Sequence, residues 1–384
     1  MTFADFQLHP DLVRAVEQLG FIQPTPIQTL AIPPALAGRD VLACAMTGSG
    51  KTAAFLLPIL QQLIAQPRGA TRALVLTPTR ELAGQIEMHL GQLARYSALR
   101  GASIIGGVSP EPQARAFHHG VEVLIGTPGR LLDHFDQPYA RLANLEILVL
   151  DEADRMLEMG FLPDIRRILR HTGHRRQTLF FSATMPGPIA KLATEILRNP
   201  VTLNQERKAA PAAGITHSVY PVAQNLKSKF LLELLEREGM RQVIVFTRTK
   251  HRANRLSEYL SKARISCERI HGNRSQGQRT EALAGFKSGK YRVLVATDIA
   301  SRGIDIEALG HVVNFDVPQA AEDYIHRVGR TARAERTGDA FTFVSPEEED
   351  QWRAIERAIG KRLPRLTLLN FDYAVAPQGS RLSG

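Results

Sequence analysis

Short runs of apolar, often β-branched residues recur along this chain, and a helix-like stretch separates each run from the next. The runs lie at residues 72–77, 121–126, 145–150, 177–182, 241–247, 291–297, 310–315 and 340–344. Apolar residues follow one another within a run instead of alternating with polar ones, which is typical of strands buried on both faces. Strands of this kind form parallel sheets that helices cover on both sides. We therefore predict an α/β protein with mostly parallel sheets.

A polar segment rich in Ala, Pro and Gly, NQERKAAPAAG, divides the runs into two groups of four. A chain of 384 residues is longer than one hydrophobic core usually serves, so we expect two domains. Segments of this composition commonly link domains. We predict a first α/β domain at 1–203, a linker at 204–214, a second α/β domain at 215–364 and a short tail at 365–384. The tail is weakly patterned, and we expect it to be partly loose.

Composition excludes several classes of protein. The two cysteines, Cys44 and Cys267, support neither a disulfide framework nor a thiolate zinc site. No stretch approaches the roughly 18 apolar residues of a membrane span, and the first residues lack the basic and apolar segments of a signal peptide. We expect a cytoplasmic protein with no membrane partner, and a monomer as the default state.

The positive charge is concentrated in the second half of the chain. The formal net charge is +10, and residues 241–302 alone carry 14 basic and 4 acidic side chains. A basic surface attracts polyanions through long-range attraction and counterion release. Charge alone leaves two interpretations open, a nucleic-acid partner and a solvated basic surface without one.

The segment AMTGSGKT, which begins at Ala45, has the residue types of a phosphate-binding loop. It follows the apolar run VLACA and precedes the helix-like stretch AAFLLPIL, as such loops do. Gly48 and Gly50 allow backbone amides to turn towards phosphate oxygens. Lys51 supplies a cation for the outer phosphates, and Thr52 supplies a hydroxyl for Mg²⁺. The alternative is an ordinary glycine-rich turn, and Ala45 stands where the pattern usually begins with Gly.

Three carboxylates, Asp151, Glu152 and Asp154, come directly after the apolar run LEILVL. Ligands of open parallel sheets bind at the carboxyl ends of the strands, so these side chains project where chemistry occurs. Beside a phosphate loop, Asp151 is a candidate Mg²⁺ partner through water. Glu152 is placed to orient and deprotonate the water that attacks a phosphate. The alternative is that the acids complement the dipole of a helix N-terminus, and it stays open for Asp154.

DEAD at 151–154 together with AMTGSGKT resembles the DEAD-box ATP-dependent RNA helicases. Other motifs similar to those of the family occur over about residues 1–350, namely GFIQPTPIQ, PTRELA, the Gly106–Gly107 pair, TPGR, SAT, VIVFTRTK, HGNRSQGQR, VATDIASRGIDI and HRVGRTAR. The short ending FDYAVAP and the lack of appended domains look similar to the bacterial RhlE-type helicases. The resemblance implies two tandem RecA-like domains, joined by a flexible linker, that couple RNA-stimulated ATP hydrolysis to local strand separation.

The resemblance also implies ATP and Mg²⁺ as cofactors and assigns the ATP site. Gln28 would read the adenine edge and favour ATP over GTP. Phe3 and Phe21 would pack near the base, with core packing as the alternative for both. Residues of the phosphate loop would hold the phosphates: Thr47, Gly48, Ser49, Gly50, Lys51 and Thr52. Asp305 resembles the residue that contacts the ribose.

Catalysis and coupling are implied for residues of both domains. The implied catalytic residues are Lys51, Asp151, Glu152, Arg330 and Arg333, and the metal ligands are Thr52 and Asp151. The implied coupling residues are Asp154, Ser182, Thr184 and His326. Arg330 and Arg333 lie three apart, so on a helix they would share a face, and they resemble arginine fingers. A salt-bridged surface pair is the alternative for the arginines, and a strand-end cap is the alternative for Ser182 and Thr184.

RNA contacts are implied on both domains. Those of the first domain are Pro78, Thr79, Arg80, Gly107, Thr127, Gly129 and Arg130. Those of the second are Arg274, Gln276, Arg279 and Thr297. Such residues bind the sugar–phosphate backbone without reading bases, so we expect little sequence specificity. Discrimination of RNA by its 2′-hydroxyls is carried over from the family, and the helix after TPGR would bend one strand of a duplex.

The implied mechanism is a clamp. ATP and single-stranded or duplex RNA bind across both domains, and closure brings the arginines to the γ-phosphate. Ala332 stands where the family usually has Gly and could crowd a close backbone approach, whereas Ser301 replaces a more usual Ala with little expected effect. Ribosome-associated or RNA-turnover proteins are candidate partners. The alternatives are a DNA-directed translocase and a non-catalytic RNA-binding scaffold with a decayed ATP site.

Overall fold

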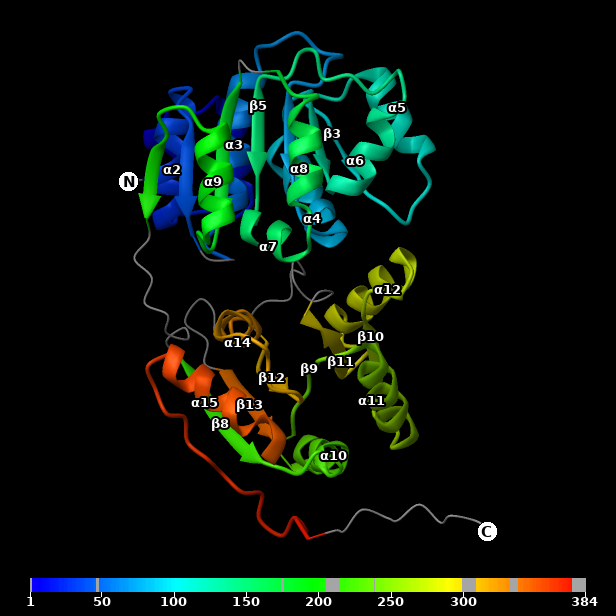
Figure 1. Ribbon diagram of the computed structural model, residues 1–384. Helices are drawn as coiled ribbons and strands as arrows, with labels where there is room; N and C mark the ends of the chain where they lie inside the picture. The colour runs from blue at the N-terminus through cyan, green and yellow to red at the C-terminus, as the bar shows by residue number, and fades with distance from the viewer. Residues whose placement is uncertain are drawn as a thin grey trace. The chain divides into compact units, whose positions relative to one another are not determined.

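The computed structural model describes residues 2–45, 48–173, 176–204, 214–237, 239–298, 309–331 and 338–374. The chain divides into two compact units, Met1–Glu206 and Arg207–Gly384. Each unit is built on a parallel sheet with helices on both faces (Figure 1). The prediction of two α/β sheets in tandem is therefore confirmed.

The first unit contains a seven-stranded parallel sheet in the order β3-β4-β2-β5-β6-β1-β7. Its strands are β1 (Val41–Cys44), β2 (Ala73–Leu76), β3 (Gly101–Ile104), β4 (Val123–Gly126), β5 (Ile147–Leu150), β6 (Gln177–Ser182) and β7 (Val201–Asn204). In the centre of the sheet, Val149 of β5 pairs with Val75 of β2 on one side and with Leu179 of β6 on the other. All strands run in one direction, so their carboxyl ends lie at the same edge of the sheet.

Each face of this sheet has its own hydrophobic core. One core is covered by the 3-10 turn η1 (Phe3–Phe6) and by α1 (Pro10–Gln18), α2 (Pro26–Leu36), α3 (Lys51–Leu63) and α4 (Arg80–Leu93). The other is covered by α5 (Glu111–His119), α6 (Pro128–Phe135), α7 (Ala153–Glu158), α8 (Leu162–Leu169) and α9 (Gly187–Ile196). Successive residues of a strand point to opposite faces, so Phe180 of β6 lies in the second core and Phe181 in the first.

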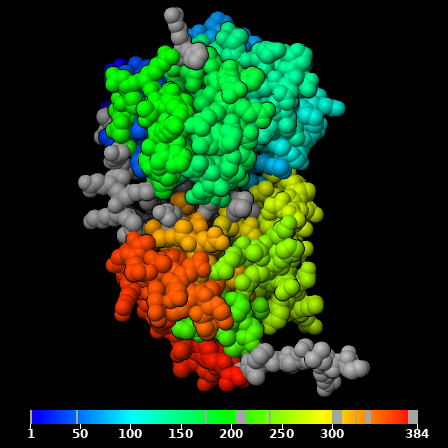
Figure 2. All heavy atoms as spheres, viewed as in Figure 1, coloured from blue at the N-terminus to red at the C-terminus, as the bar shows by residue number. Residues whose placement is uncertain are grey.

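The second unit contains a six-stranded parallel sheet in the order β10-β11-β9-β12-β13-β8. Its strands are β8 (Ile215–Pro221), β9 (Val243–Thr247), β10 (Cys267–Ile270), β11 (Val293–Thr297), β12 (His311–Asn314) and β13 (Gly338–Val344). Helices α10 (Lys227–Arg237) and α11 (Lys250–Lys262) contribute to one core. The cores of the other face include residues of α12 (Gln276–Lys287), α14 (Ala321–Val328) and α15 (Glu349–Ala358). The 3-10 turn η2 (Pro346–Glu348) leads into α15, which lies at the surface in the orange-red part of Figure 2.

Each of the eight predicted runs contains a strand, whereas β3, β7, β8 and β10 were not predicted. These four strands are the edges of the two sheets. An edge strand has a neighbour on one side only and is less completely covered, so polar residues are tolerated within it. The sequence of β10, CERI, is an example, since three of its four residues are only half-buried.

Residues 364–373 differ from the expected loose tail because they pack onto the second unit. The backbone N–H of Val219 donates to the carbonyl of Pro364 at 2.9 Å, and that of Leu366 donates to the carbonyl of Val219 at 2.8 Å. The ring of Phe371 meets that of Phe230 edge-on, with centroids 4.9 Å apart. In the described part of the chain, no helix combines the length and the apolar character that crossing a membrane requires.

Candidate functional site

The phosphate-loop segment lies between β1 and α3, as the sequence predicted. Gly50 has a φ of +91°, a left-handed conformation that favours glycine. A Cβ atom at this position would lie 2.6 Å from Gln28 Nε2 and 2.9 Å from Thr25 Oγ1, so there is no room for a side chain. The loop is therefore held from the side of α2, and Thr25 Oγ1 also donates to the carbonyl of Ser49 at 2.8 Å.

A buried cation and a buried carboxylate face each other beside this loop. Lys51 Nζ donates to the carbonyl of Ala45 at 3.2 Å and lies 3.8 Å from Asp151 Oδ1. The two side chains are only 6% and 3% exposed. Burial raises the pKa of the Asp151 carboxyl to about 6, while the charge of Lys51 acts in the opposite direction. The ionised form of a carboxyl group in this environment is stabilised when a second positive charge binds beside it.

Glu152 occupies a strained turn between β5 and α7. Its φ is +53°, in the left-handed region, and its backbone N–H donates to Asp151 Oδ1 at 3.0 Å. Outliers of this kind are common at functional sites.

Asp154 is tied to the end of the neighbouring strand β6. Its backbone N–H donates to Ser182 Oγ at 3.1 Å, and Ser182 Oγ donates to the carbonyl of Thr184 at 2.7 Å. The backbone N–H of Thr184 donates to Asp154 Oδ2 at 2.5 Å. The expected proximity of these three residues is thus present, and Thr184 contributes its backbone amide to this contact. Asp154 is also in the first turn of α7, so the dipole alternative and the contact to Ser182 coexist.

Gln28 contacts the phosphate loop through both ends of its amide. Nε2 donates to the carbonyl of Gly50 at 3.1 Å, and Oε1 accepts from the backbone N–H of Thr25 at 2.9 Å. Phe3 is buried and Phe21 is 38% exposed, with ring centroids 6.1 Å apart. The exposed ring of Phe21 leaves an aromatic surface available, while Phe3 belongs to the core.

The RNA contacts implied for the first unit form a second group, away from the phosphate loop. They follow β2, β3 and β4, which are neighbours at one side of the sheet. The Arg80 side chain covers Gly107, where φ is +79° and a Cβ atom would lie 2.0 Å from Arg80 Nη1. Arg130 Nη1 donates to the carbonyl of Val108 at 3.2 Å. The remaining members of the group are Pro78 and Thr79 before α4, Thr127 at the N-cap of α6, and Gly129 within it.

A dense group of cations surrounds the implied RNA contacts of the second unit. Arg274 lies 3.4 Å from Glu268, and Arg279 is buried in α12, which begins at Gln276. Burial and then four cations lower the pKa of the neighbouring His271; these cations are Arg269, Arg274, Lys250 and Arg279. Thr297 is the last residue of β11. Burial is the larger cause of the lowered pKa of His271, and the four cations add a positive potential where a polyanion is expected.

Arg330 lies outside a helix, so the condition under which Arg330 and Arg333 would share a helical face is not met at Arg330. Helix α14 ends at Val328, Gly329 is its C-cap, and Thr331 forms a parallel bridge with Leu309. The Thr331 hydroxyl also donates to the carbonyl of Leu309, so the chain is tied to Leu309 directly after the turn that follows the helix. His326 is in the last turn of α14, and Arg330 is buried. Thr47, Asp305 and Arg333, as well as Ser301 and Ala332, lie outside the described residues.

Arg327, which the sequence analysis did not single out, is one of the most highly connected side chains of the second unit. Its Nε and Nη2 bind the two oxygens of Asp298 at 2.6 and 2.7 Å. Its Nη1 donates to Asn314 Oδ1 at 3.2 Å and to the carbonyl of Asp316 at 2.7 Å. The signal available in the sequence was its position next to His326 within HRVGRTAR.

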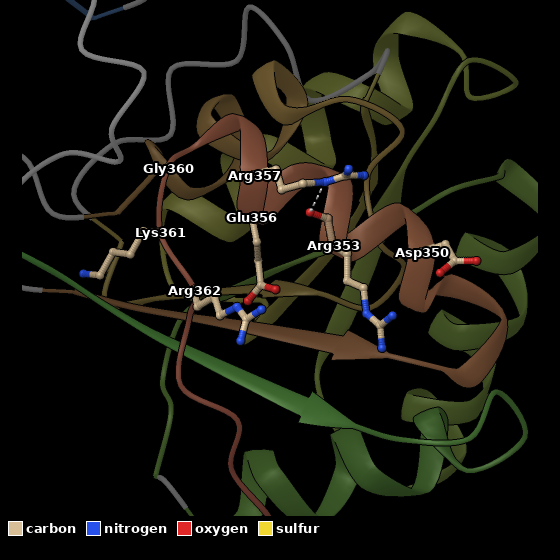
Figure 3. Close-up of a pocket in the computed structure, with 7 residues that line it drawn as sticks. All are labelled: Asp350, Arg353, Glu356, Arg357, Gly360, Lys361 and Arg362. Atoms are coloured by element: carbon tan, nitrogen blue, oxygen red, sulfur yellow. Dashed lines mark hydrogen bonds between the residues drawn. The ribbon is translucent and has the colours of Figure 1, made fainter.

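A surface cavity of about 640 Å³ lies on α15 and the residues after it (Figure 3). Its lining carries charges of both signs, from Asp350, Arg353, Glu356, Arg357, Lys361 and Arg362. Glu356 accepts a hydrogen bond from the backbone N–H of Leu363 at 2.9 Å, and Arg353 pairs with Glu349 at 3.1 Å. None of the residues implied for ATP or RNA lines this cavity.

Two family models match the chain, and they cover the two units in turn. The model of the DEAD/DEAH box helicase matches residues 25–192, and that of the helicase conserved C-terminal domain matches residues 226–335. The DEAD-box ATP-dependent RNA helicase CshA of Bacillus licheniformis is 42% identical over 98% of this chain and 77% of its own length. This chain belongs to the DEAD-box ATP-dependent RNA helicases. CshA of Bacillus subtilis is 41% identical over 98% of the chain and 76% of its own length.

Solved structures of other DEAD-box proteins share this fold. Dbp5 of S. cerevisiae bound to RNA and ADP BeF3 has a TM-score of 0.86 and 29% identity, covering 95% of each chain. Mss116p bound to ssRNA and AMP-PNP has a TM-score of 0.85 and 29% identity, covering 95% of this chain and 79% of that one. The expected RecA-like DEAD-box fold is confirmed by these likenesses.

The oxygen donors beside the phosphate loop of this DEAD-box chain fit Mg²⁺. Asp151 supplies one buried carboxylate, and Thr52 supplies a hydroxyl in the first turn of α3. In the part of the chain that the structure describes, no group of three or more His, Cys, Asp or Glu side chains could hold a metal ion. Mg²⁺ is commonly bound through one or two carboxylates with substrate phosphates and water, so a sparse protein donor set is suited to it.

Proposed function

We propose that this protein couples RNA-stimulated hydrolysis of ATP to the local separation of short RNA duplexes, or to the remodelling of RNA–protein complexes, without reading base sequence. The observation that carries the proposal is the contact between Asp154 and the Ser182–Thr184 turn. It joins the strand end that bears Asp151 and Glu152 to the neighbouring strand end. A change at the phosphates can therefore be transmitted to another part of the first unit.

In the proposed reaction, the phosphate loop and Lys51 bind the phosphates of ATP. Asp151 and Thr52 would hold Mg²⁺, which would neutralise negative charge on the phosphates. Glu152 orients the attacking water and accepts its proton. Arg330 and Arg333 supply positive charge to the γ-phosphate, and such a residue accelerates phosphoryl transfer by roughly 10³–10⁵. Gln28 reads adenine in this proposal, and Asp305 contacts the ribose. The contacts of Gln28 to Thr25 and Gly50 support a role next to the nucleotide.

RNA is proposed to bind along two surfaces that carry mainly arginines, glycines and hydroxyls. The group around Arg80, Gly107 and Arg130 would contact the backbone on the first unit, and the group around Arg274 and Arg279 on the second. The CshA relatives are RNA helicases, and the solved structures of Dbp5 and Mss116p contain bound RNA, which supports the same ligand here. Phosphate contacts position a strand without specifying its sequence.

We propose that the domains at 1–203 and 215–364 close on ATP and RNA together, with 204–214 as a flexible linker. Each ligand then favours the closed state, so each raises the affinity for the other by the same factor. His326 and the coupling residues Asp154, Ser182 and Thr184 would report the nucleotide state.

We propose an RhlE-like subgroup on the residues of the segment FDYAVAP, whereas the relatives described above carry the name CshA. A monomer, a cytoplasmic location and partners from the ribosome or from RNA turnover are the further expectations. Side-by-side growth of complemented strains that lack either an RhlE-type or a CshA-type helicase would separate the two subgroups.

Steady-state ATP hydrolysis with Mg²⁺ tests the proposal, measured without nucleic acid, with single-stranded RNA and with single-stranded DNA of the same sequence. We expect strong stimulation by RNA and little by DNA, followed by unwinding of a short RNA duplex. Equal stimulation by DNA would favour a DNA-directed translocase. An absence of hydrolysis with retained RNA binding would favour a scaffold with a decayed ATP site.

A further inference from the structure

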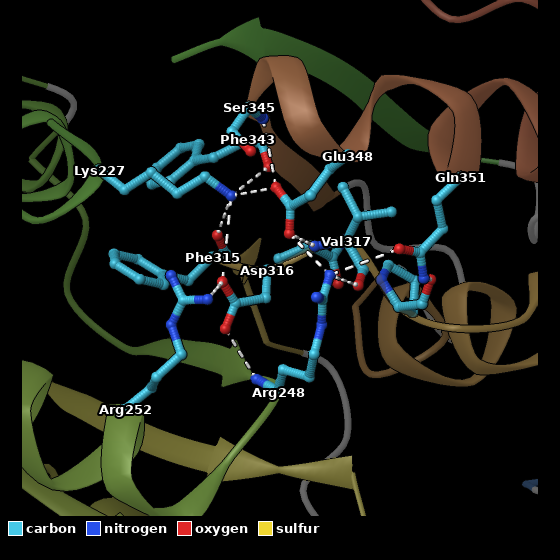
Figure 4. Close-up of polar contacts among 12 residues, drawn as sticks. Lys227, Arg248, Arg252, Phe315, Asp316, Val317, Phe343, Ser345, Glu348 and Gln351 are labelled. Atoms are coloured by element: carbon cyan, nitrogen blue, oxygen red, sulfur yellow. Dashed lines mark hydrogen bonds and ion pairs between the residues drawn. The ribbon is translucent and has the colours of Figure 1, made fainter. Parts of the chain in front are cut away.

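A fully buried carboxylate, Asp316, lies among cations just after β12 in the second unit (Figure 4). Its Oδ1 is 3.1 Å from Arg252 Nη1 and 4.0 Å from Lys227 Nζ. Its Oδ2 accepts a hydrogen bond from the backbone N–H of Arg248 at 2.8 Å. The carboxylate thereby connects the end of β9, the first turn of α11 and the start of α10.

Lys227 and Glu348 extend this arrangement to a third strand end. Lys227 Nζ donates to the carbonyls of Phe315 at 2.8 Å and Phe343 at 3.0 Å, and it pairs with the Glu348 carboxylate. The other oxygen of Glu348 accepts from Arg248 Nη2 at 2.8 Å. Arg248 is therefore held at its backbone by Asp316 and at its guanidinium by Glu348.

On its other side, Asp316 contacts the element that precedes Arg330. The backbone carbonyl of Asp316 accepts from Arg327 Nη1 at 2.7 Å, and Arg327 also forms its two-pronged pair with Asp298. Arg327 belongs to α14, the helix that ends just before Arg330. Asp298 follows Thr297, the implied RNA contact at the end of β11.

On the side of the implied RNA contacts, the turn that contains Arg248 leads directly into α11. Lys250, the first residue of α11, donates from Nζ to Asn273 Oδ1 at 3.2 Å. Asn273 immediately precedes Arg274, in the segment HGNRSQGQR. The side chain and the carbonyl of Asp316 thus contact two separate elements, one adjoining the implied RNA contacts and one adjoining the implied γ-phosphate contact.

We propose that Asp316 is a positioning residue that couples RNA binding to ATP binding in the second unit, by holding the Arg248 turn and helix α14 in one fixed arrangement. This inference rests on the proposed function, since it concerns the mutual effect of the same two ligands. Asp316, Lys227 and Glu348 form the buried centre of this ion network, while Arg248 and Arg252 reach it from partly exposed positions. A buried ion pair contributes little net stability but resists rearrangement, because displacing one member leaves a charge uncompensated. Because this network contacts both the Arg248 turn and helix α14, it can link the binding of RNA to the binding of ATP.

The test is a coupling ratio measured on the full chain. The dissociation constant of a fluorescent single-stranded RNA is determined without nucleotide and with AMP-PNP and Mg²⁺, and the first value is divided by the second. For Asp316→Asn, which keeps the shape but removes the charge, we expect the ratio to fall at least fivefold. The RNA dissociation constant without nucleotide and that of ATP without RNA should stay within about threefold of wild type.

Glu356→Gln is the matched control, because Glu356 is also a buried carboxylate of the second unit and accepts a backbone hydrogen bond, from Leu363, outside the Asp316 network. A wild-type ratio in Asp316→Asn would overturn the inference. So would an equal loss of affinity with and without nucleotide, or the same loss of ratio in Glu356→Gln. If Asp316→Asn does not fold, the same ratio is measured for Arg252→Gln. We expect this ratio to fall at least twofold, and an unchanged ratio would contradict the inference. A ratio near one in the wild type would instead contradict the proposed function itself, and the inference with it.

Discussion

The backbone N–H of Asp154 donates a hydrogen bond to Ser182 Oγ at 3.1 Å, and this contact joins two residues that are 28 positions apart in the chain. Ser182 Oγ in turn donates a hydrogen bond to the carbonyl of Thr184 at 2.7 Å. One hydroxyl therefore bridges the turn after β6 and the carboxylate-bearing turn after β5. Removing it should loosen the relation between the two turns and leave the phosphate loop intact.

Ser182→Ala should reduce RNA-stimulated ATP turnover about tenfold, since a lost buried hydrogen bond costs about 1–2 kcal/mol. The dissociation constant of ATP should stay within about twofold of wild type. Steady-state hydrolysis and nucleotide binding measure the two quantities. Thr194→Ala is the control, because its hydroxyl donates to the carbonyl of Ala190 on the exposed side of α9. Equal effects in both variants would contradict the coupling role of Ser182.

Glu152→Gln should lower turnover by at least about 10², because an amide cannot accept the proton of the attacking water. Binding of ATP and of RNA should remain within about twofold of wild type, since the left-handed turn at Glu152 does not depend on its charge. Single-turnover hydrolysis and anisotropy of labelled RNA measure these effects. Glu158→Gln, an exposed neighbour paired with Arg155, should hydrolyse ATP normally. Fast hydrolysis by Glu152→Gln would show that another residue is the base.

Gly107→Ala should raise the RNA concentration needed for half-maximal ATPase stimulation by about tenfold or more. The added methyl group would meet Arg80 Nη1 at 2.0 Å, and φ at this position is +79°, so Arg80 must leave its place. ATP affinity without RNA should not change, because the phosphate loop lies beside other strands. Gly91→Ala on α4, where nothing lies within 4 Å, is the control. If the RNA concentration for half-maximal stimulation is unchanged in Gly107→Ala, Arg80 does not contribute to the RNA-binding surface.

Gln28→Glu should weaken ATP binding by about tenfold. The carboxylate can still accept from the Thr25 N–H, but it cannot donate to the carbonyl of Gly50 and repels it. Isothermal titration with ATP and GTP measures the change. If Gln28 reads adenine, ATP loses more affinity than GTP; if it supports only the loop, both lose equally. Gln61→Glu on α3 retains the acceptor for the His9 N–H and should have no effect on binding.

The stability of the second unit should decline between about pH 6.5 and pH 4 because of His217. Burial, and then the charge of Lys361, lowers the pKa of His217 to about 4, and the ring bonds the Tyr324 hydroxyl at 2.7 Å. The unfolded chain binds the proton near pH 6.5, so the stabilising effect is complete above that pH and is lost as the pH falls through the range. Linkage limits its size to at most about 3 kcal/mol.

Chemical denaturation of the wild type and of His217→Asn at several pH values measures this effect. The variant lacks the titrating ring, so the difference in unfolding free energy between the two proteins should change by up to about 3 kcal/mol across the range. A difference that is constant with pH would show that His217 is not the responsible group.

The sequence by itself determined the central strands and the chemistry at their ends. Runs such as LEILVL are apolar throughout because both faces of a central parallel strand are buried, and this requirement is visible residue by residue. The motifs of the phosphate loop and of the DEAD carboxylates are similarly local, since each consists of a few adjacent residues. For the same reason, the four edge strands were missed, because partial exposure relaxes the demand for apolar residues.

Only the tertiary structure decided which charged residues become buried together. Lys227 and Glu348 are 121 positions apart, and each alone resembles an ordinary surface charge in the sequence. Their burial depends on the strand order that brings the ends of β9, β12 and β13 side by side. The course of the chain at Arg330 is also set by a distant contact, the bridge between Thr331 and Leu309. Local patterns report the environment of one segment, whereas a charge can be buried only where folding supplies its partner from elsewhere.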